Sequence, residues 1–212
     1  MTSLIILIIA AYLAGSVPFG VLIAAAHGQD LRKIGSGNIG ATNVARALGK
    51  RWAYTCFVLD CLKGLLPMLI AKSLLPDPPA VADLALWLAV GCSAVIGHIF
   101  PIYLKFRGGK GVATSLGMVL GLYPYYTIPG AVAFVVWAVL VLIFRYVSLA
   151  SITAAVAFPL ALVAAIIIKP DWQFTSLWPL ILAALIMPAL VILRHVENIK
   201  RLLDGSETKV LQ

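Results

Sequence analysis

Residues 3–26 read SLIILIIAAYLAGSVPFGVLIAAA, an apolar run of the length that crosses a bilayer as a helix. Similar runs fill most of the chain, of whose 212 residues 62% are hydrophobic and 11% are charged, with a mean hydropathy of +1.04. This composition excludes a water-soluble domain. The sequence therefore predicts an all-α polytopic membrane protein, with a single integral-membrane domain over residues 1–212.

Seven such runs are expected to be transmembrane helices. They lie at about residues 3–26, 52–73, 81–104, 112–127, 130–144, 152–168 and 175–193. The first run contains GSVPFG at Gly15–Gly20, where Pro18 removes a helix hydrogen bond. A kink or break at this point and a simple packing notch of small residues are both open.

The basic residues predict the orientation of these spans. With the N-terminus outside, thirteen of the 16 Lys and Arg residues fall in cytoplasmic segments, in agreement with the positive-inside rule. They are Arg32, Lys33, Arg46, Lys50, Arg51, Lys105, Arg107, Lys110, Arg145, Arg194, Lys200, Arg201 and Lys209. The C-terminus is then cytoplasmic, and the net charge of +8 needs no nucleic acid as a partner. The polar segments of the chain also fall on this side, where we expect them to converge on one site.

One cytoplasmic segment, GSGNIGATNVAR at Gly35–Arg46, is small, polar and rich in glycine. Glycines let an anion approach the backbone, and a short helix at about Thr42–Leu48 would place Arg46 one turn beyond Thr42. The segment formally matches G-x-G-x-x-G, but a membrane helix precedes it instead of the strand that a dinucleotide site requires. A phosphate site and an ordinary loop are both open.

A second cytoplasmic segment, GGKG at Gly108–Gly111, leads into the fourth expected span. Its spacing is not that of a Walker motif, but Lys110 would lie beside a helix N-terminus, which favours an anion. Lys110 as a phosphate ligand and Lys110 as a membrane-interface anchor are both open, and for Lys105 and Arg107 we favour the anchor.

Two ionisable residues, Asp60 and Lys63, lie inside the second expected span. Three residues apart, they share one helix face and can pair with each other or with a ligand. No Ser or Cys lies in a pattern typical of a nucleophile with an activated His, so a covalent acyl-enzyme is disfavoured. No residue spacing indicates a metal site, and we expect no cofactor.

Six motifs, in order, resemble the bacterial membrane acyl-phosphate:glycerol-3-phosphate acyltransferase family. They are Gly15–Gly20, Gly35–Arg46, Leu59-Asp60 with Lys63-Gly64, Gly97-His98 through GGKGVAT at 108–114, Arg145–Ser151, and Arg194-His195 with Glu197-Asn198. The resemblance covers nearly the whole chain. It implies a seven-helix enzyme of the bacterial cytoplasmic (inner) membrane that moves an acyl group from acyl phosphate to the 1-hydroxyl of glycerol 3-phosphate. The products would be lysophosphatidic acid and phosphate, the first acylation step of phospholipid biosynthesis.

The position of each motif suggests a role for its residues. We expect Ser36, Arg46, Lys110 and Ser148 to bind phosphate with help from the backbone of Gly37, Gly40, Gly108 and Gly109, and His195 and Asn198 to orient glycerol 3-phosphate. Asn38, Thr42 and Asn43 would contact the ligand or only hold the loop, and His195 with Asn198 would otherwise cap a helix end. Because acyl phosphate is already activated, positioning and electrostatic stabilisation suffice, with a substrate phosphate as general base.

Two other classes compete with this prediction: a transporter of a phosphorylated metabolite and a noncatalytic membrane scaffold. A transporter needs polar residues along a path to the other face, whereas one half of most spans is purely apolar. A scaffold would leave Arg46 and Lys110 replaceable without consequence. The sequence leaves open whether thioester donors are accepted and whether the chain associates with the soluble enzyme that makes acyl phosphate.

Overall fold

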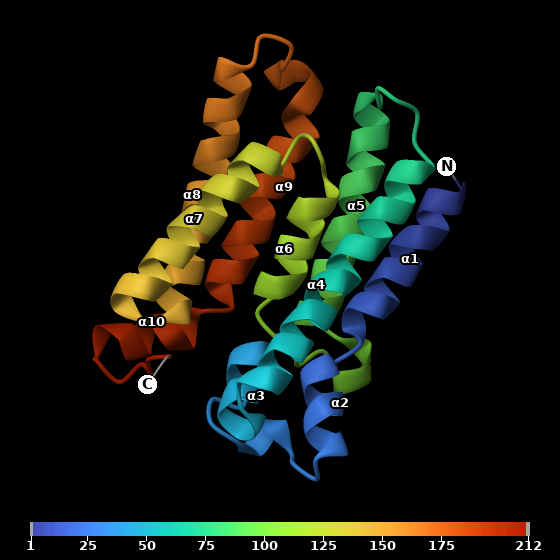
Figure 1. Cartoon of the computed structure of the whole chain (residues 1–212). Coiled ribbons are helices and arrows are strands. Elements are labelled where there is room, and N and C mark those ends of the chain that lie inside the picture. Colours follow the sequence, from blue (N-terminus) through green and yellow to red (C-terminus); the bar gives the residue numbers. More distant parts are fainter. Residues whose placement is uncertain (1, 211–212) are drawn as a thin grey trace. The chain divides into compact units, whose positions relative to one another are not determined.

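The computed structural model describes residues 2–210, and within that range the regular structure is helical throughout, with no strand. The α-helices are α1 (Thr2–Ser16), α2 (Phe19–Ala26), α3 (Ala41–Leu48), α4 (Lys50–Ser73), α5 (Val81–Ile99), α6 (Val112–Gly121), α7 (Thr127–Phe144), α8 (Val147–Ile168), α9 (Phe174–Leu193) and α10 (Val196–Leu203) (Figure 1). Short 3-10 helices cover Leu31–Lys33 and Ile102–Leu104. The all-α prediction is confirmed.

Six helical segments of the described chain are long and apolar enough to cross a membrane. They are Thr2–Ala26, Lys50–Ser73, Val81–Leu104, Thr127–Phe144, Val147–Ile168 and Phe174–Leu193. The fourth predicted span, residues 112–127, differs: its helix α6 has 10 residues and ends at Gly121. At 1.5 Å per residue this helix is about 15 Å long, roughly half the thickness of the hydrocarbon core.

The chain divides into two compact units, one ending at Gly121 and the other beginning at Leu122, and each is described by itself. In the first unit α1 packs on α5, and α4 packs on α3, α5 and α6. A small apolar cluster of Ala24, Leu31, Val44 and Cys56 seats α2 and α3 against the start of α4. The first unit thus places α2 and α3 at one end and the turn between α4 and α5 at the other (Figure 1).

The sequence left open whether Gly15–Gly20 forms a break or a packing notch, and the structure shows a break between α1 and α2. Helix α1 ends at Ser16, α2 starts at Phe19, and Pro18 has ψ 74°, outside the helical region. Pro18 has no N–H to continue the first helix, so the chain breaks there. The Gly15–Gly20 segment therefore contains a helix break, and its Gly15 also lets α1 approach α5, because a methyl group there would collide with the Ala94 carbonyl.

Helix α6 packs against α4, and the two helices run in the same direction. A methyl group on Gly64 would collide with the carbonyl of Thr114, and one on Gly117 would collide with the carbonyl of Cys61. The glycines thus let the two backbones touch. Near the other end of α6, Gly121 lies against Met68, so α6 advances alongside the second half of α4.

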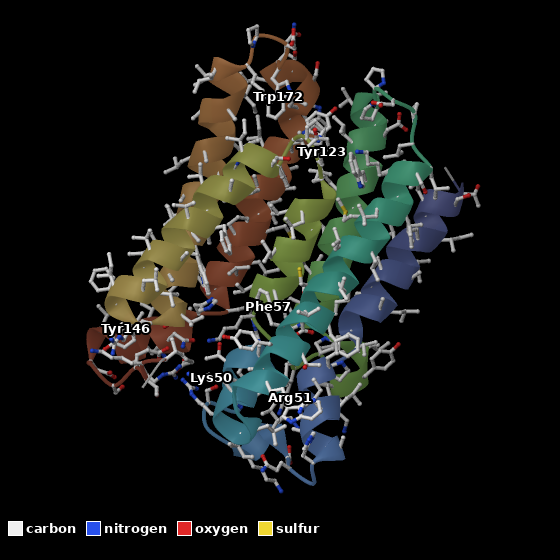
Figure 2. The ribbon with its side chains drawn as sticks, viewed as in Figure 1. Lys50, Arg51, Phe57, Tyr123, Tyr146 and Trp172 are labelled. Carbon is white, nitrogen blue, oxygen red and sulfur yellow. The ribbon has the colours of Figure 1, made fainter. Side chains whose placement is uncertain are left out.

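In the second unit α8 packs on α7, α9 and α10. The stretch after Leu122 is fixed by Tyr126, whose buried hydroxyl donates to the Leu180 carbonyl at 2.7 Å. Tyr123 and Trp172 lie at one end of this unit and Tyr146 at the other (Figure 2). Helix α8 begins at Val147, five residues before the expected start of the sixth span at about residue 152.

Large apolar side chains cover the outer surface of both units. Leu142, Ile167 and Ile168 are at least 70% exposed, and many other Leu, Ile, Val and Phe side chains of the long helices are also exposed. Such a surface is unstable in water and is stable in a bilayer. The chain is a multi-pass membrane protein.

Candidate active site

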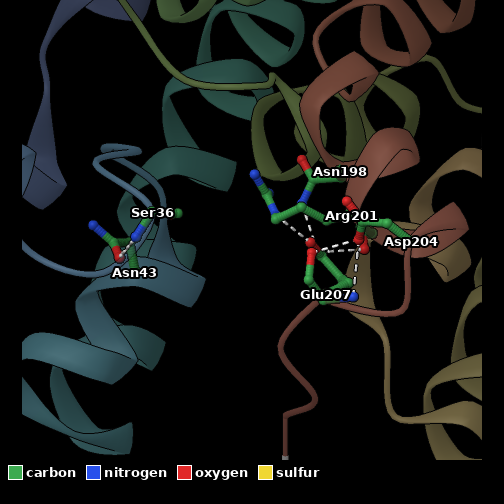
Figure 3. A network of polar contacts seen from close by, with 8 residues as sticks. Ser36, Asn43, Asn198, Arg201, Asp204 and Glu207 are labelled. Atoms are coloured by element: carbon green, nitrogen blue, oxygen red, sulfur yellow. Dashed lines mark hydrogen bonds and ion pairs between the residues drawn. The ribbon is translucent and has the colours of Figure 1, made fainter.

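The Gly35–Arg46 segment is held in shape by the buried side chain of Asn43. Its Oδ1 accepts a hydrogen bond from the Ser36 N–H at 3.1 Å (Figure 3), and its Nδ2 donates to the carbonyls of Leu31 at 3.0 Å and Ile34 at 2.9 Å. These three bonds use most of the amide's capacity. Of the two predicted roles for Asn43, the geometry favours holding the loop.

Two predicted phosphate ligands, Ser36 and Arg46, are exposed on this loop. Gly35 has φ +56°, and a methyl group there would press on Asn43 Oδ1 and lie 3.2 Å from Arg46 Cδ. The side chain of Arg46 therefore packs over the glycine turn that carries Ser36. Helix α3 follows the turn as predicted and ends at Leu48, where Gly49, with φ +86°, caps it.

Backbone N–H groups in this loop already have acceptors in the chain. Gly37 N donates to the Ile34 carbonyl at 3.0 Å, and Gly40 N donates to Asn38 Oδ1 at 2.9 Å. The Asn38 side chain thus also shapes the turn. Thr42, half-buried, lies in the first turn of α3. Side chains, more than the backbone of Gly37 and Gly40, are available here for an anion.

The Gly108–Gly111 segment folds back onto the end of α5. Gly108 N donates to the Ile99 carbonyl at 3.2 Å, and Gly109 N donates to the His98 carbonyl at 3.0 Å. Lys110 follows, half-buried, two residues before α6 begins at Val112. The first N–H groups of any α-helix lack intrahelical acceptors, so the α6 N-terminus favours an anion beside Lys110.

Two hydroxyls in the first turns of α6 add to this end of the helix. Thr114 Oγ1 and Ser115 Oγ are buried side-chain atoms with no hydrogen-bond partner within residues 2–210. Buried hydroxyls without partners are rare and call for an acceptor or donor from elsewhere. No site role was predicted for them, although both lie within four residues of GGKG, in the first turn of α6.

In the second unit, the C-terminal tail returns to the start of α8 through Glu207. Its Oε1 accepts from Ser148 Oγ at 2.7 Å and from Asn198 Nδ2 at 2.6 Å, and its Oε2 accepts from Arg201 Nε at 2.7 Å (Figure 3). The tail is fixed further by Val210 N, which donates to the Arg145 carbonyl at 2.8 Å. The predicted ligands Ser148 and Asn198 are thus brought together, around a carboxylate of the chain itself.

The charge state of Glu207 follows from these contacts. Burial alone would raise the pKa of its carboxyl, but hydrogen bonds from Ser148, Asn198 and Arg201 outweigh burial and hold this pKa below its usual value. Glu207 is therefore an anion at neutral pH. Sequence reasoning missed it, because nothing in the sequence shows that residue 207 meets residue 148.

His195, also in the second unit, stands at the junction of α9 and α10. Its ring is 2% exposed, and its Nδ1 lies 2.8 Å from the Val191 carbonyl. A carbonyl only accepts, so Nδ1 carries a proton. Helix α9 ends at Leu193 and α10 begins at Val196, so His195 lies at the break between them and Asn198 in the first turn of α10.

Metal ligands do not gather in the part of the chain that the structure describes: it holds no group of three or more His, Cys, Asp and Glu side chains suited to an ion. The chemistry available is hydrogen bonding and positive charge from Ser, Asn, His, Arg and Lys side chains. These side chains lie at the ends of the helices, outside the apolar spans.

Together, the fold and these groups define the class: an integral membrane protein whose helices carry basic, polar segments suited to anionic ligands. The family described as Glycerol-3-phosphate acyltransferase matches residues 5–205. The chain belongs to this family and is an acyltransferase enzyme.

Individual relatives cover almost the whole chain. The glycerol-3-phosphate acyltransferase of Geotalea daltonii is 47% identical, over 98% of this chain and 97% of its own length, and that of Aquifex aeolicus is 45% identical, over 95% and 96%. The crystal structure of PlsY (YgiH), an integral membrane glycerol 3-phosphate acyltransferase, in its glycerol 3-phosphate form has a TM-score of 0.85. It is 42% identical and matches 99% of this chain and 96% of that one. A second structure of PlsY, in the lysophosphatidic acid form, has a TM-score of 0.82 with 42% identity, over 98% of this chain and 95% of that one.

Proposed function

We propose that this enzyme transfers a fatty acyl group from acyl phosphate to the 1-hydroxyl of glycerol 3-phosphate, which yields lysophosphatidic acid and phosphate. The observation that carries the proposal is the match over nearly the full length to PlsY in forms with glycerol 3-phosphate and lysophosphatidic acid. Basic, polar segments at the ends of lipid-facing helices suit substrates that join a phosphate to an acyl chain. The reaction begins phospholipid biosynthesis.

The chemical step needs no nucleophile from the protein. The 1-hydroxyl oxygen attacks the acyl carbon, the bond from that carbon to the phosphate oxygen breaks, and phosphate leaves. The proton of the hydroxyl passes to a phosphate oxygen of the substrate, which serves as general base. The protein supplies orientation and stabilises the negative charge that develops on the acyl oxygen.

Ser36, Arg46 and Lys110 are the phosphate ligands in this proposal. Arg46 offers a bidentate guanidinium beside the Gly35 turn, and Ser36 offers a hydroxyl on that turn. Lys110 adds a positive charge at the start of α6, where Thr114 and Ser115 hold hydroxyls without partners in the described chain. Gly108 and Gly109 place this lysine through their hydrogen bonds to α5.

His195 and Asn198 orient glycerol 3-phosphate in this proposal. The imidazole of His195 is held by its Nδ1, which donates to the Val191 carbonyl, and the ring is the group that faces a substrate hydroxyl in this proposal. Asn198 and Ser148 are held by Glu207, which fixes their rotamers. A site of this kind is preorganised before substrate binds.

We further propose seven spans, with the N-terminus outside and the C-terminus in the cytoplasm of a bacterial inner membrane. In the first unit, α2 and α3 lie opposite the turn between α4 and α5; in the second, α10 lies opposite the turn between α8 and α9 (Figure 1). The positive-inside rule makes the basic end of each unit cytoplasmic. The chain must then cross between Gly111 and Thr127, so α6 with residues 122–126 is a short span.

Sidedness is testable with cysteines introduced one at a time into a chain whose three native cysteines are replaced. An impermeant maleimide should label Asp77→Cys and Asp171→Cys on the outer side of the membrane, and Ser206→Cys only after lysis. Labelling of Asp171→Cys and Ser206→Cys from the same side would exclude this topology.

The site assignment is tested by steady-state kinetics of purified variants in detergent. Losing one charge-assisted hydrogen bond to phosphate costs about 1.5–3 kcal/mol, so we expect Ser36→Ala, Arg46→Met and Lys110→Met each to lower kcat/KM for glycerol 3-phosphate by roughly 10- to 150-fold. Lys105→Met is the matched control, because Lys105 is exposed on the same loop as Lys110 and should be dispensable. Equal activity of the Lys110 and Lys105 variants would overturn the assignment.

A further inference from the structure

Three ionisable side chains meet inside the first unit, away from the exposed face of the Gly35 turn. Asp60 and Lys63 of α4 and His98 of α5 are each at most 6% exposed. Lys63 Nζ lies 2.8 Å from Asp60 Oδ1, and His98 Nδ1 lies 3.6 Å from the same oxygen. One carboxylate oxygen thus faces both basic side chains.

Lys63 connects this cluster to the break between α1 and α2. Its Nζ donates to the Val17 carbonyl at 2.9 Å and lies 5.7 Å from the centre of the Phe19 ring. A helix end leaves carbonyls without intrahelical donors, and in a membrane protein such a carbonyl needs a partner from elsewhere. The Val17 carbonyl accepts the Phe19 N–H at 3.2 Å and Lys63 Nζ from α4, so Lys63 ties the break to this helix.

The break in turn contacts the first phosphate-binding segment. Gly20, in the first turn of α2, is so close to Ile39 that a methyl group on Gly20 would collide with the Ile39 carbonyl. Ile39 lies between the turn that carries Ser36 and the helix that carries Arg46. A shift of the break would therefore move this segment.

His98 connects the cluster to the second phosphate-binding segment. Its carbonyl accepts the N–H of Gly109, and its ring lies so close that a methyl group on Gly109 would collide with Nε2. The orientation of the imidazole therefore limits where Gly109, and Lys110 after it, can lie. Asp60 faces the other nitrogen of the ring.

We propose that Asp60 is a positioning residue: through Lys63 and His98 it sets the spacing between the Gly35–Arg46 and Gly108–Gly111 segments. The inference rests on the proposed assignment of both segments to phosphate binding. A buried ion pair that only holds helices together can be replaced by a neutral pair of similar volume. A pair that positions a site cannot, because small displacements of binding groups are costly to catalysis.

The experiment compares Asp60→Asn, in which Lys63 loses its carboxylate partner, with the double variant Asp60→Asn/Lys63→Met, in which both charges of the pair are removed. Thermal stability in detergent and the kinetics with glycerol 3-phosphate are measured for each. We expect the single variant to lose both stability and activity. The double variant should regain most of the stability, yet keep a KM for glycerol 3-phosphate raised ~10- to 100-fold, with a smaller change in kcat.

Trp87→Phe is the matched control. Its indole, buried in α5, donates to the Met68 carbonyl at 2.9 Å, so the variant also loses a buried polar contact in the first unit. It should lower stability and leave KM unchanged. If single charge variants do not fold, the double variant and His98→Gln still provide the kinetic comparison.

A double variant with the KM of the unmodified enzyme would overturn the inference, and so would a Trp87→Phe variant with an equally raised KM. Ser36→Ala separates this inference from the site assignment. If Ser36→Ala raises KM while the double variant does not, only the positioning role fails. If neither variant changes KM and turnover is intact, the site assignment fails as well.

Discussion

Removal of the Glu207 carboxylate should release the C-terminal tail and disorder the residues that it holds. In Glu207→Ala, Ser148 and Asn198 lose a charged acceptor at 2.7 and 2.6 Å, and both side chains are buried. Hydrogen bonds to charged groups contribute about 1.5–3 kcal/mol each. The ion pair with Arg201, whose side chain is 36% exposed, adds at most about 1 kcal/mol. Loss of these contacts therefore destabilises the bound tail by about 3–7 kcal/mol. This is an upper range, because water can replace some of the lost hydrogen bonds.

Amide hydrogen exchange reports this local opening. The N–H groups of Glu207 and Val210 donate to the carbonyls of Arg201 and Arg145, so both should be protected in the unmodified enzyme. A loss of about 3 kcal/mol corresponds to exchange faster by roughly 150-fold. We also expect KM for glycerol 3-phosphate to rise, because Ser148 and Asn198 lose their fixed rotamers.

Glu197→Ala is the matched control for this variant. Glu197 is an acidic residue of α10 whose Oε1 lies 3.0 Å from Lys200 Nζ. The side chains of Glu197 and Lys200 are 72% and 66% exposed. Such pairs contribute little, so exchange and KM should stay unchanged. Exchange at Val210 that is unchanged in Glu207→Ala, or equally fast in Glu197→Ala, would refute the reasoning.

Four further outcomes are expected. Asn43→Ala removes three hydrogen bonds that shape the Gly35 turn and should raise KM for glycerol 3-phosphate ~10- to 100-fold, whereas an unchanged KM would show that the turn holds its shape without them. Gly109→Ala should lower both activity and thermal stability, because its methyl group meets the His98 ring; full activity would contradict that close packing. Glu207 should keep the tail bound at pH values above 4.5, the ordinary glutamate pKa, and the tail should loosen as the pH falls through the lowered pKa of Glu207. A spin label at Thr208→Cys would report this loosening. A tail that loosens as the pH rises would contradict the direction of the pKa shift. His195→Ala should raise KM but keep kcat within ~10-fold if a substrate phosphate is the base, whereas a kcat loss of ~100-fold or more with intact binding would identify a histidine base.

The long helices were predictable because composition decides them. Apolar runs of spanning length and the clustering of Lys and Arg need no tertiary information, and six runs appear as helices within a few residues of their predicted ends. The failures have tertiary causes. Tyr126 bonds to Leu180, 54 residues away, in the stretch predicted to continue the fourth span. Helix α8 begins at Val147, and the Ser148 hydroxyl in its first turn donates to Glu207, 59 residues away.

The candidate site was predictable in its residue types and less so in its contacts. Gly35–Arg46 was recognised from its glycines, and its helix lies where expected. That Asn43 would face inward to three backbone groups, and that the N–H of Gly37 and Gly40 would have acceptors, depends on the turn geometry and not on spacing. The Asp60 and Lys63 pair was visible as a helical pair, but His98 joins it only through the packing of α4 on α5.

The central claim is an acyl transfer between two phosphate-bearing substrates without a covalent enzyme intermediate. The most direct test measures phosphate and lysophosphatidic acid together, with purified enzyme, acyl phosphate and glycerol 3-phosphate. We predict that both products form in equal amounts and that no phosphate is released when glycerol 3-phosphate is left out. Phosphate release without the acceptor, or a burst of phosphate equal to the amount of enzyme before the acceptor is added, would contradict it.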